Sequence, residues 1–176
     1  MVLLGLGVRD GATPIDAWMQ QAGRGAMGTP LGSLLMFTDY RTAQALAVTA
    51  IGVSLYRRLW SLLPVIVLAP FVAVFASRLL KPLFGRMKDE GLAYPSGHTT
   101  LMVVLLGMLI LAVGARRWLV WAVVAFAVLG IIGQAVTYHY LTDTVGSVLL
   151  GTSLVCLAVA ALRAVGRRIR RLGLRL

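Results

Sequence analysis

The chain has 176 residues, of which 59% are hydrophobic, a mean hydropathy of +0.87 and a formal net charge of +11. A soluble domain of this length is usually about half apolar, so this composition indicates one domain covered by a bilayer. The lone Cys156 excludes a disulfide framework. Six arginines lie in the last fourteen residues, directly after an apolar stretch. This placement favours membrane lipids, and not nucleic acid, as partners.

The chain begins with a segment, residues 1–32, that we expect to be external or interfacial. Residues 1–8 are apolar but too short to cross a bilayer. Two interpretations stay open: residues 1–8 end an incomplete first helix, or they lie shallowly in the membrane interface. Residues 9–32 are rich in Gly and contain an amphipathic turn around residues 15–19.

Residues 33–162 are predicted to form an all-α, polytopic transmembrane bundle of five to six spans. Each apolar stretch approaches the ~20 residues needed to cross a hydrocarbon core. A backbone in lipid must satisfy its own hydrogen bonds, so these stretches are expected to be helices. The stretches run over about residues 34–56, 60–80, 99–115, 118–137 and 145–162.

Charged residues between the stretches predict the orientation of the bundle. Arg57–Arg58 and Arg116–Arg117 form short connections without an acidic residue, and residues 163–176 form a basic tail. By the positive-inside rule, all three are expected to be cytoplasmic. Residues 81–98 and 139–143 then both lie on the outer face. The excess of Arg over Lys is typical of a GC-rich bacterial genome, so we expect the inner or plasma membrane of a cell envelope.

The first outer segment predicts an anion-binding pocket. It carries Lys81, Arg86 and Lys88 within eight residues and ends with a Pro-Ser-Gly-His sequence before an apolar stretch. Gly97 allows a ligand to approach the backbone closely, and Ser96 and Gly97 fall at a helix N-terminus that attracts anions. A capped helix start beside a positive loop would give the same pattern.

The second outer segment carries His139 and Asp143. On a helix these two residues share a face, so the carboxylate could hold one imidazole nitrogen and leave the other free to attack or accept a proton. The only other histidine is His98, and the only two lysines, Lys81 and Lys88, lie on the same predicted side. This coincidence favours one shared site over separate structural roles.

Together, these residues resemble the type 2 phosphatidic acid phosphatases, whose motifs are K-x6-R-P, P-S-G-H and S-R-x5-H-x3-D. Pro95–His98 match the second motif, His139 and Asp143 match the end of the third, and Lys81 matches the start of the first. The resemblance covers about residues 34–162. It implies a membrane phosphatase that hydrolyses a phosphomonoester or diphosphate of a lipid, such as phosphatidate, phosphatidylglycerophosphate or a polyprenyl-linked phosphate.

The resemblance also implies a mechanism without metal or cofactor. His139 would form a phosphohistidine, Asp143 would orient it, and His98 would protonate the leaving group. Such catalysis consists mainly of positioning and charge stabilisation. We expect the phosphate to be bound by Lys81, Lys88, Ser96, Gly97 and Arg86.

Two motif arginines are absent from this chain. Lys88 replaces the arginine of the first motif, and Gly133 replaces that of the third. A lysine offers a point charge without a bidentate fork, and glycine offers nothing. Each lost charge-assisted contact is worth ~1.5–3 kcal/mol, or about 10–100-fold in rate. Arg86 and Gln134 are candidates to compensate, and the pocket is either degenerate or specialised for another head group.

Three hypotheses therefore stay open. The first is an active lipid phosphatase with a reshaped pocket. The second is a catalytically weak homologue that binds or carries anionic lipids. The third is a metalloenzyme in which His98, His139 and Asp143 form a metal triad.

Overall fold

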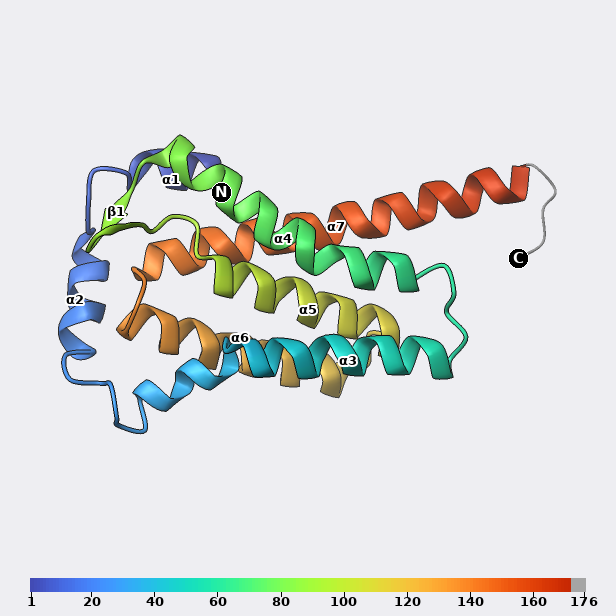
Figure 1. Cartoon of the computed structure of the whole chain (residues 1–176), viewed down its shortest axis with the longest axis horizontal. Helices are drawn as coiled ribbons and strands as arrows, with labels where there is room; N and C mark the ends of the chain where they lie inside the picture. Colours follow the sequence, from blue (N-terminus) through green and yellow to red (C-terminus); the bar gives the residue numbers. More distant parts are fainter. Residues whose placement is uncertain (172–176) are drawn as a thin grey trace.

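The computed structural model describes residues 1–171, and its all-α class agrees with the prediction from sequence (Figure 1). The only sheet in the described part is an antiparallel hairpin of β1 (Met87–Lys88) and β2 (Gly91–Leu92). The helices are α1 (Val2–Gly7), α2 (Pro14–Ala22), the 3-10 helix η1 (Gly32–Phe37), α3 (Tyr40–Tyr56), α4 (Leu63–Phe84), α5 (Gly97–Val113), α6 (Arg117–Val136) and α7 (Leu141–Arg171).

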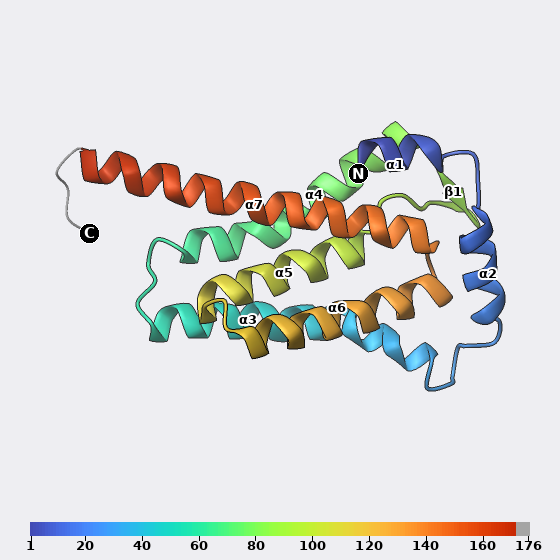
Figure 2. The same ribbon diagram turned by 180° about the vertical axis from the view of Figure 1, so that it is seen from behind.

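Helices α3 to α7 form a bundle with α5 at its centre. Figures 1 and 2 show α5 between the other long helices, and it contacts α3, α4, α6 and α7. Helix α5 is apolar all round, as expected of a helix that is surrounded by others. Val104 and Met108 are fully buried in the core, where they pack with Ala50 of α3 and with Ile66 and Ala73 of α4.

The bundle has the surface of a membrane protein. Helices α4 and α6 and the Leu141–Arg167 part of α7 are each long and apolar enough to cross a bilayer. Large apolar side chains such as Phe71, Phe75 and Trp121 are exposed on the outside of these helices. Such a surface would be unfavourable in water, so lipid is its natural cover. The shorter helices α3 and α5 have 17 residues each, and the expected five to six spans stay a prediction.

Two predicted stretches differ in their bounds. The first stretch is divided, because the Asp39 carboxylate accepts a hydrogen bond from the Arg41 backbone N–H at 3.0 Å and starts α3 anew after η1. The last stretch begins earlier than expected, at Leu141, and continues as a helix through the predicted tail to Arg171. Asp143 therefore lies in the first turn of α7.

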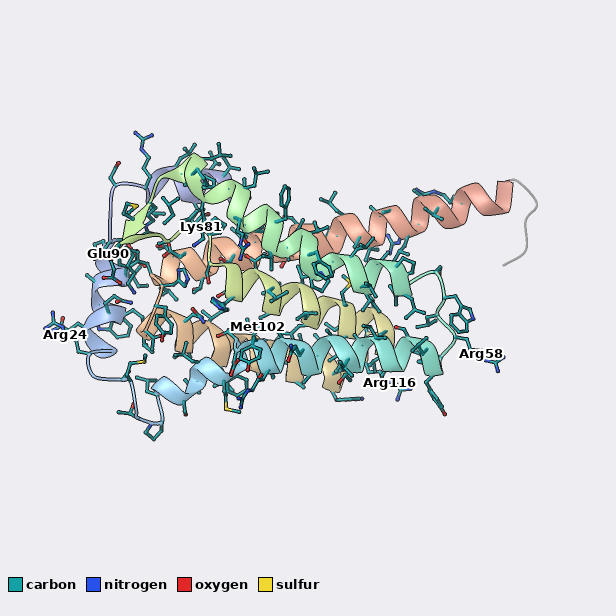
Figure 3. All side chains as sticks on the ribbon, viewed as in Figure 1. Arg24, Arg58, Lys81, Glu90, Met102 and Arg116 are labelled. Carbon is teal, nitrogen blue, oxygen red and sulfur yellow. The ribbon has the colours of Figure 1, made fainter. Side chains whose placement is uncertain are left out.

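The connections divide between the two ends of the bundle. Figure 3 shows Arg58 and Arg116 at one end and Arg24 and Glu90 at the other. The end with Glu90 also carries the hairpin, the start of α5 and the turn between α6 and α7 (Figure 1). The two segments that carry the motif residues are thus neighbours in space.

The N-terminal segment covers this same end. Helix α2 starts with a capping box, in which Thr13 and Asp16 satisfy each other's backbone N–H groups, and it packs against α6 and α7. Gln20 of α2 donates from Nε2 to the backbone oxygens of Ala135, at 2.6 Å, and His139, at 3.0 Å. Residues 1–32 are therefore part of the packed structure around the site.

Helix η1 packs against α6 at Gly133. A Cβ atom at this position would lie 2.6 Å from the Leu34 carbonyl carbon and 2.7 Å from its oxygen. Such contacts are with backbone, which cannot rotate away. The arginine of the third motif therefore has no room here, because η1 occupies its space.

We predict that Gly133→Ala lowers the free energy of unfolding by about 1–3 kcal/mol, since η1 must shift to admit one methyl group. The matched control is Gly52→Ala in α3, where no atom lies within 4 Å of the added Cβ. It should be neutral or stabilise the helix by about 0.5–1 kcal/mol. Thermal unfolding of both variants in detergent measures the difference, and equal midpoints would contradict the tight packing of η1.

Candidate active site

A cavity of about 500 Å³ lies at the end of the bundle that carries the motif residues. Both histidines line it, together with cationic residues of α4. The lining is Thr38, Tyr40, Val74, Ser77, Arg78, Lys81, Gly97, His98, Leu101 and His139. Two imidazoles that lie far apart in the sequence therefore face one space large enough for a small anion.

The start of α5 supplies His98 and the backbone of Gly97 to the cavity. Ser96 is fully buried, and its Oγ accepts hydrogen bonds from the backbone N–H of Thr99, at 3.4 Å, and from the Thr99 hydroxyl, at 3.2 Å. Ser96 does not line the cavity and caps the helix. The serine thus caps α5, as the alternative interpretation expected, and it does not face the cavity as a phosphate-binding residue would. The next two residues do face the cavity, and anion binding there stays a prediction.

His139 lies in the turn between α6 and α7, and so the expectation that it shares a helix with Asp143 is wrong. Its backbone N–H donates to the Gln134 oxygen at 2.9 Å, which fixes the turn. The side chain is 12% exposed, and its Nδ1 lies 3.6 Å from Asp143 Oδ2. This is longer than a hydrogen bond, but catalytic contacts are often long before substrate binds. The carboxylate faces Nδ1 and leaves Nε2 as the nitrogen for chemistry.

The two lysines have different surroundings. Lys81, in the last turn of α4, lines the cavity and donates to the Leu92 backbone oxygen. Lys88 is not among the lining residues: its Nζ donates to the Thr137 oxygen at 3.1 Å and lies 5.2 Å from the centre of the Tyr140 ring. Burial lowers the pKa of Lys88, and nearby carboxylates only partly offset this.

Arg78 is a cavity residue that no sequence motif predicts. It lies on α4, three residues before Lys81, so the two cations share a helix face. No salt bridge of Arg78 is found among residues whose side chains are described. Charged residues within a spanning helix are functional candidates, so its place at the end of an apolar stretch was a usable signal.

Arg86 does not line the cavity, which corrects its expected role in phosphate binding. Its side chain is fully buried, with Nη1 2.6 Å from Asp143 Oδ1 and Nη2 2.8 Å from Asp16 Oδ2. Nη1 also donates to the Thr142 hydroxyl, and Nη2 to the Gly11 oxygen. The guanidinium stacks over Tyr140 at 4.5 Å. These contacts occupy both terminal nitrogens, and Nε is buried without a hydrogen-bond partner among the described residues. Arg86 therefore orients Asp143 and does not face the cavity.

Asp16 is the second anion of this buried network, and its role is not visible in the sequence. Its Oδ1 accepts from the Thr142 backbone N–H at 2.9 Å, and its Oδ2 from the Thr142 hydroxyl at 2.8 Å. Burial raises the pKa of Asp16, but hydrogen bonds from Thr142 and Thr13 outweigh it and hold the pKa below its usual value. Helix α2 is thus anchored to the start of α7 by a charged carboxylate.

A comparison with known protein families finds the PAP2 superfamily over residues 45–167. The match covers more than half of the chain and contains both histidines, Asp143 and the cations of α4. The chain belongs to the PAP2 superfamily. Superfamily members are phosphatases, so the family supports a phosphoric ester hydrolase. No curated protein and no solved structure matches the chain.

The PAP2 match leaves out the segment that surrounds the site from the N-terminal side. Helices α1, α2 and η1 lie before residue 45, yet they supply Asp16 and the packing partner of Gly133. Among the described residues, no three His, Cys, Asp or Glu side chains are grouped as ligands of one metal ion.

We predict that Asp16→Asn lowers the free energy of unfolding by about 3 kcal/mol, because a buried guanidinium loses one of its two anions. The matched control is Asp10→Asn, whose carboxylate is 90% exposed and pairs with Arg9 at 3.4 Å. The control should cause no measurable change, since exposed ion pairs contribute little. Chemical unfolding curves of both variants would measure this, and an unchanged midpoint for Asp16→Asn would refute the anchoring role.

Proposed function

We propose that this PAP2 protein is an integral membrane phosphatase that hydrolyses the phosphomonoester or diphosphate of a lipid through a phosphohistidine. The observation that carries the proposal is the shared cavity of His98, His139 and Lys81, with Asp143 behind His139. One imidazole can attack phosphorus while the other faces the leaving oxygen, which is the arrangement that in-line transfer requires.

The reaction has two steps in this geometry. In the first, Nε2 of His139 forms a bond to phosphorus, the bond from phosphorus to the ester oxygen breaks, and His98 gives its proton to that oxygen. In the second, His98 takes a proton from a water molecule whose oxygen attacks the phosphohistidine, and inorganic phosphate and free His139 result. Asp143 stabilises the positive charge that develops on the His139 ring.

Three groups in the cavity supply charge for the transferred phosphoryl group. Lys81 and Arg78 reach it from α4, and the backbone at Gly97 reaches it from the N-terminus of α5. A guanidinium can bind two phosphate oxygens at once, whereas an ammonium acts as a point charge. Arg78 therefore replaces part of what the chain lacks at Lys88 and Gly133.

A lipid substrate and an outward-facing site are the finer parts of the proposal. The exposed apolar surfaces of α4 and α6 favour insertion into a bilayer, so the cavity lies at a membrane that contains phosphates with apolar tails. The basic connections at Arg57–Arg58 and Arg116–Arg117 lie at the opposite end of the bundle (Figure 3). By the positive-inside rule that end is cytoplasmic, so the site faces outward from the inner or plasma membrane.

We predict that His139→Ala and His98→Ala each reduce phosphate release from lipid phosphates by about 100-fold or more, because a nucleophile or a positioned acid is lost. The purified protein in detergent micelles is assayed with lipid monophosphates and diphosphates, and thermal unfolding verifies that each variant is folded. We expect inhibition by vanadate and resistance to chelators. Retained activity in both variants would reject the mechanism, and an inactive wild-type protein that binds lipid phosphate would favour the lipid-binding alternative.

We predict that Arg78→Ala lowers kcat/KM by about 10–100-fold, since one charge-assisted contact of ~1.5–3 kcal/mol is removed. Arg78→Lys should restore only part of the loss, because it lacks the fork. The control is Arg24→Ala in the turn after α2, which lies at the same end of the bundle but lines neither this cavity nor its neighbour (Figure 3). Equal rates for Arg78→Ala and Arg24→Ala would show that Arg78 does not touch the phosphate.

A further inference from the structure

A second cavity of about 340 Å³ adjoins the first and shares Thr38 and His98 with it. We propose that this cavity is a subsite for a hydroxyl-bearing leaving group, so that the preferred substrate is a phosphate ester with a free hydroxyl near the phosphate. The inference rests on the proposed phosphatase function and names the class of its substrate. The lining is Gly32, Ser33, Leu35, Met36, Thr38, Asp39, His98, Gln134 and Tyr138.

Gln134 provides the first hydrogen-bond acceptor of the subsite. Its side chain is only 3% exposed, and its Nε2 donates to the Thr38 hydroxyl at 2.7 Å. The Thr38 hydroxyl itself donates to the Leu35 oxygen at 3.1 Å, so it must accept from Gln134, and this fixes which way the amide points. Oε1 of Gln134 is left without a hydrogen-bond partner among the described residues. A buried acceptor without a partner is costly, so a ligand that donates to it is favoured.

Asp39 provides the second acceptor. Its Oδ1 accepts from the Arg41 backbone N–H at the start of α3, and no salt bridge joins it to a cation among the residues whose side chains are described. The carboxylate is half-buried and lines the cavity. Its Oδ2 can therefore accept a hydrogen bond from a ligand. Both identified acceptors need donors, and the phosphate itself, which is an anion, would be repelled by Asp39.

The position of His98 decides which part of a substrate enters the subsite. His98 lines both cavities and protonates the leaving oxygen in the proposed reaction. The phosphoryl group lies among the cations of the first cavity, so the leaving alcohol extends past His98 into the second. A hydroxyl on that alcohol can donate to Asp39 or Gln134 and accept from the Tyr138 hydroxyl, whereas the Ser33 hydroxyl already donates to the Pro30 oxygen at 2.6 Å. The exposed Met36 at the rim offers an apolar path for a chain toward lipid.

The subsite also explains why the third motif differs in this chain. Helix η1 builds one wall of the second cavity and packs so closely on Gly133 that no side chain fits there. An arginine at this place would bring a second cation and displace η1. The space that binds phosphate in the motif is thus used here for a wall with hydrogen-bond acceptors, and the pocket is specialised, not degenerate.

The test compares two esters of equal chain length in the same micelles: an alkyl phosphate, and a 1-O-alkyl-glycerol 3-phosphate, whose 2-hydroxyl is free. We expect the wild-type protein to prefer the hydroxyl-bearing ester by about 10-fold in kcat/KM, because its analogue leaves buried acceptors unpaired. Asp39→Ser keeps a residue that caps α3 but removes the carboxylate from the cavity. It should reduce this preference by about 5-fold or more.

Gln134→Met is the second variant, which keeps the volume of the side chain and removes its acceptor. It should also reduce the preference. Glu90→Gln, an exposed carboxylate at the same end of the bundle (Figure 3), should leave the preference unchanged. Equal kcat/KM for the two esters in the wild-type protein would overturn the subsite, and so would an unchanged ratio in both folded variants. In either case, phosphate release that depends on His139 would still support the proposed function. Release from neither ester by the wild-type protein would overturn both.

Discussion

The buried guanidinium of Arg86 is the interaction on which the site depends. A cation without solvent is tolerated only where anions and hydrogen-bond acceptors surround it. Arg86 has Asp16 on one side and Asp143 on the other, at 2.8 and 2.6 Å. These three residues come from α2, from the connection after α4 and from α7. One ion network therefore joins the three segments that converge at this end of the bundle.

This network also fixes the geometry of the reacting groups. Asp143 presents Oδ1 to Arg86, while its Oδ2 accepts from the Tyr140 backbone N–H at 3.0 Å and faces His139. The carboxylate thus cannot rotate without breaking a contact on its other side. In the proposed mechanism Arg86 acts through Asp143, and the phosphate is bound by the cations that line the cavity. Arg78 and Lys81, both on α4, are placed for this role.

Hydropathy predicted the long helices well, because an apolar stretch in lipid has few alternatives to a helix. The site was predicted less completely. Motif spacing predicted that His98, His139 and Lys81 lie together, and they line one cavity. It could not show that Arg86 turns inward while Arg78 faces the cavity, since both are single cations near one helix end. Asp16 could not be found at all, because its partner Thr142 lies 126 residues away and no local pattern links them.

The two departures from the motifs have different physical causes. Lys88 turns to the Thr137 oxygen and to the Tyr140 ring, over which Arg86 also stacks, so it lies beside the ion network and outside the cavity lining. Position 133 requires glycine, because the backbone of η1 lies too close to admit a side chain. If the pocket had merely decayed, unfilled space would be expected at Gly133. The space is instead filled by a packed segment that carries Thr38 and leads into Asp39, which agrees with the proposed hydroxyl-binding subsite.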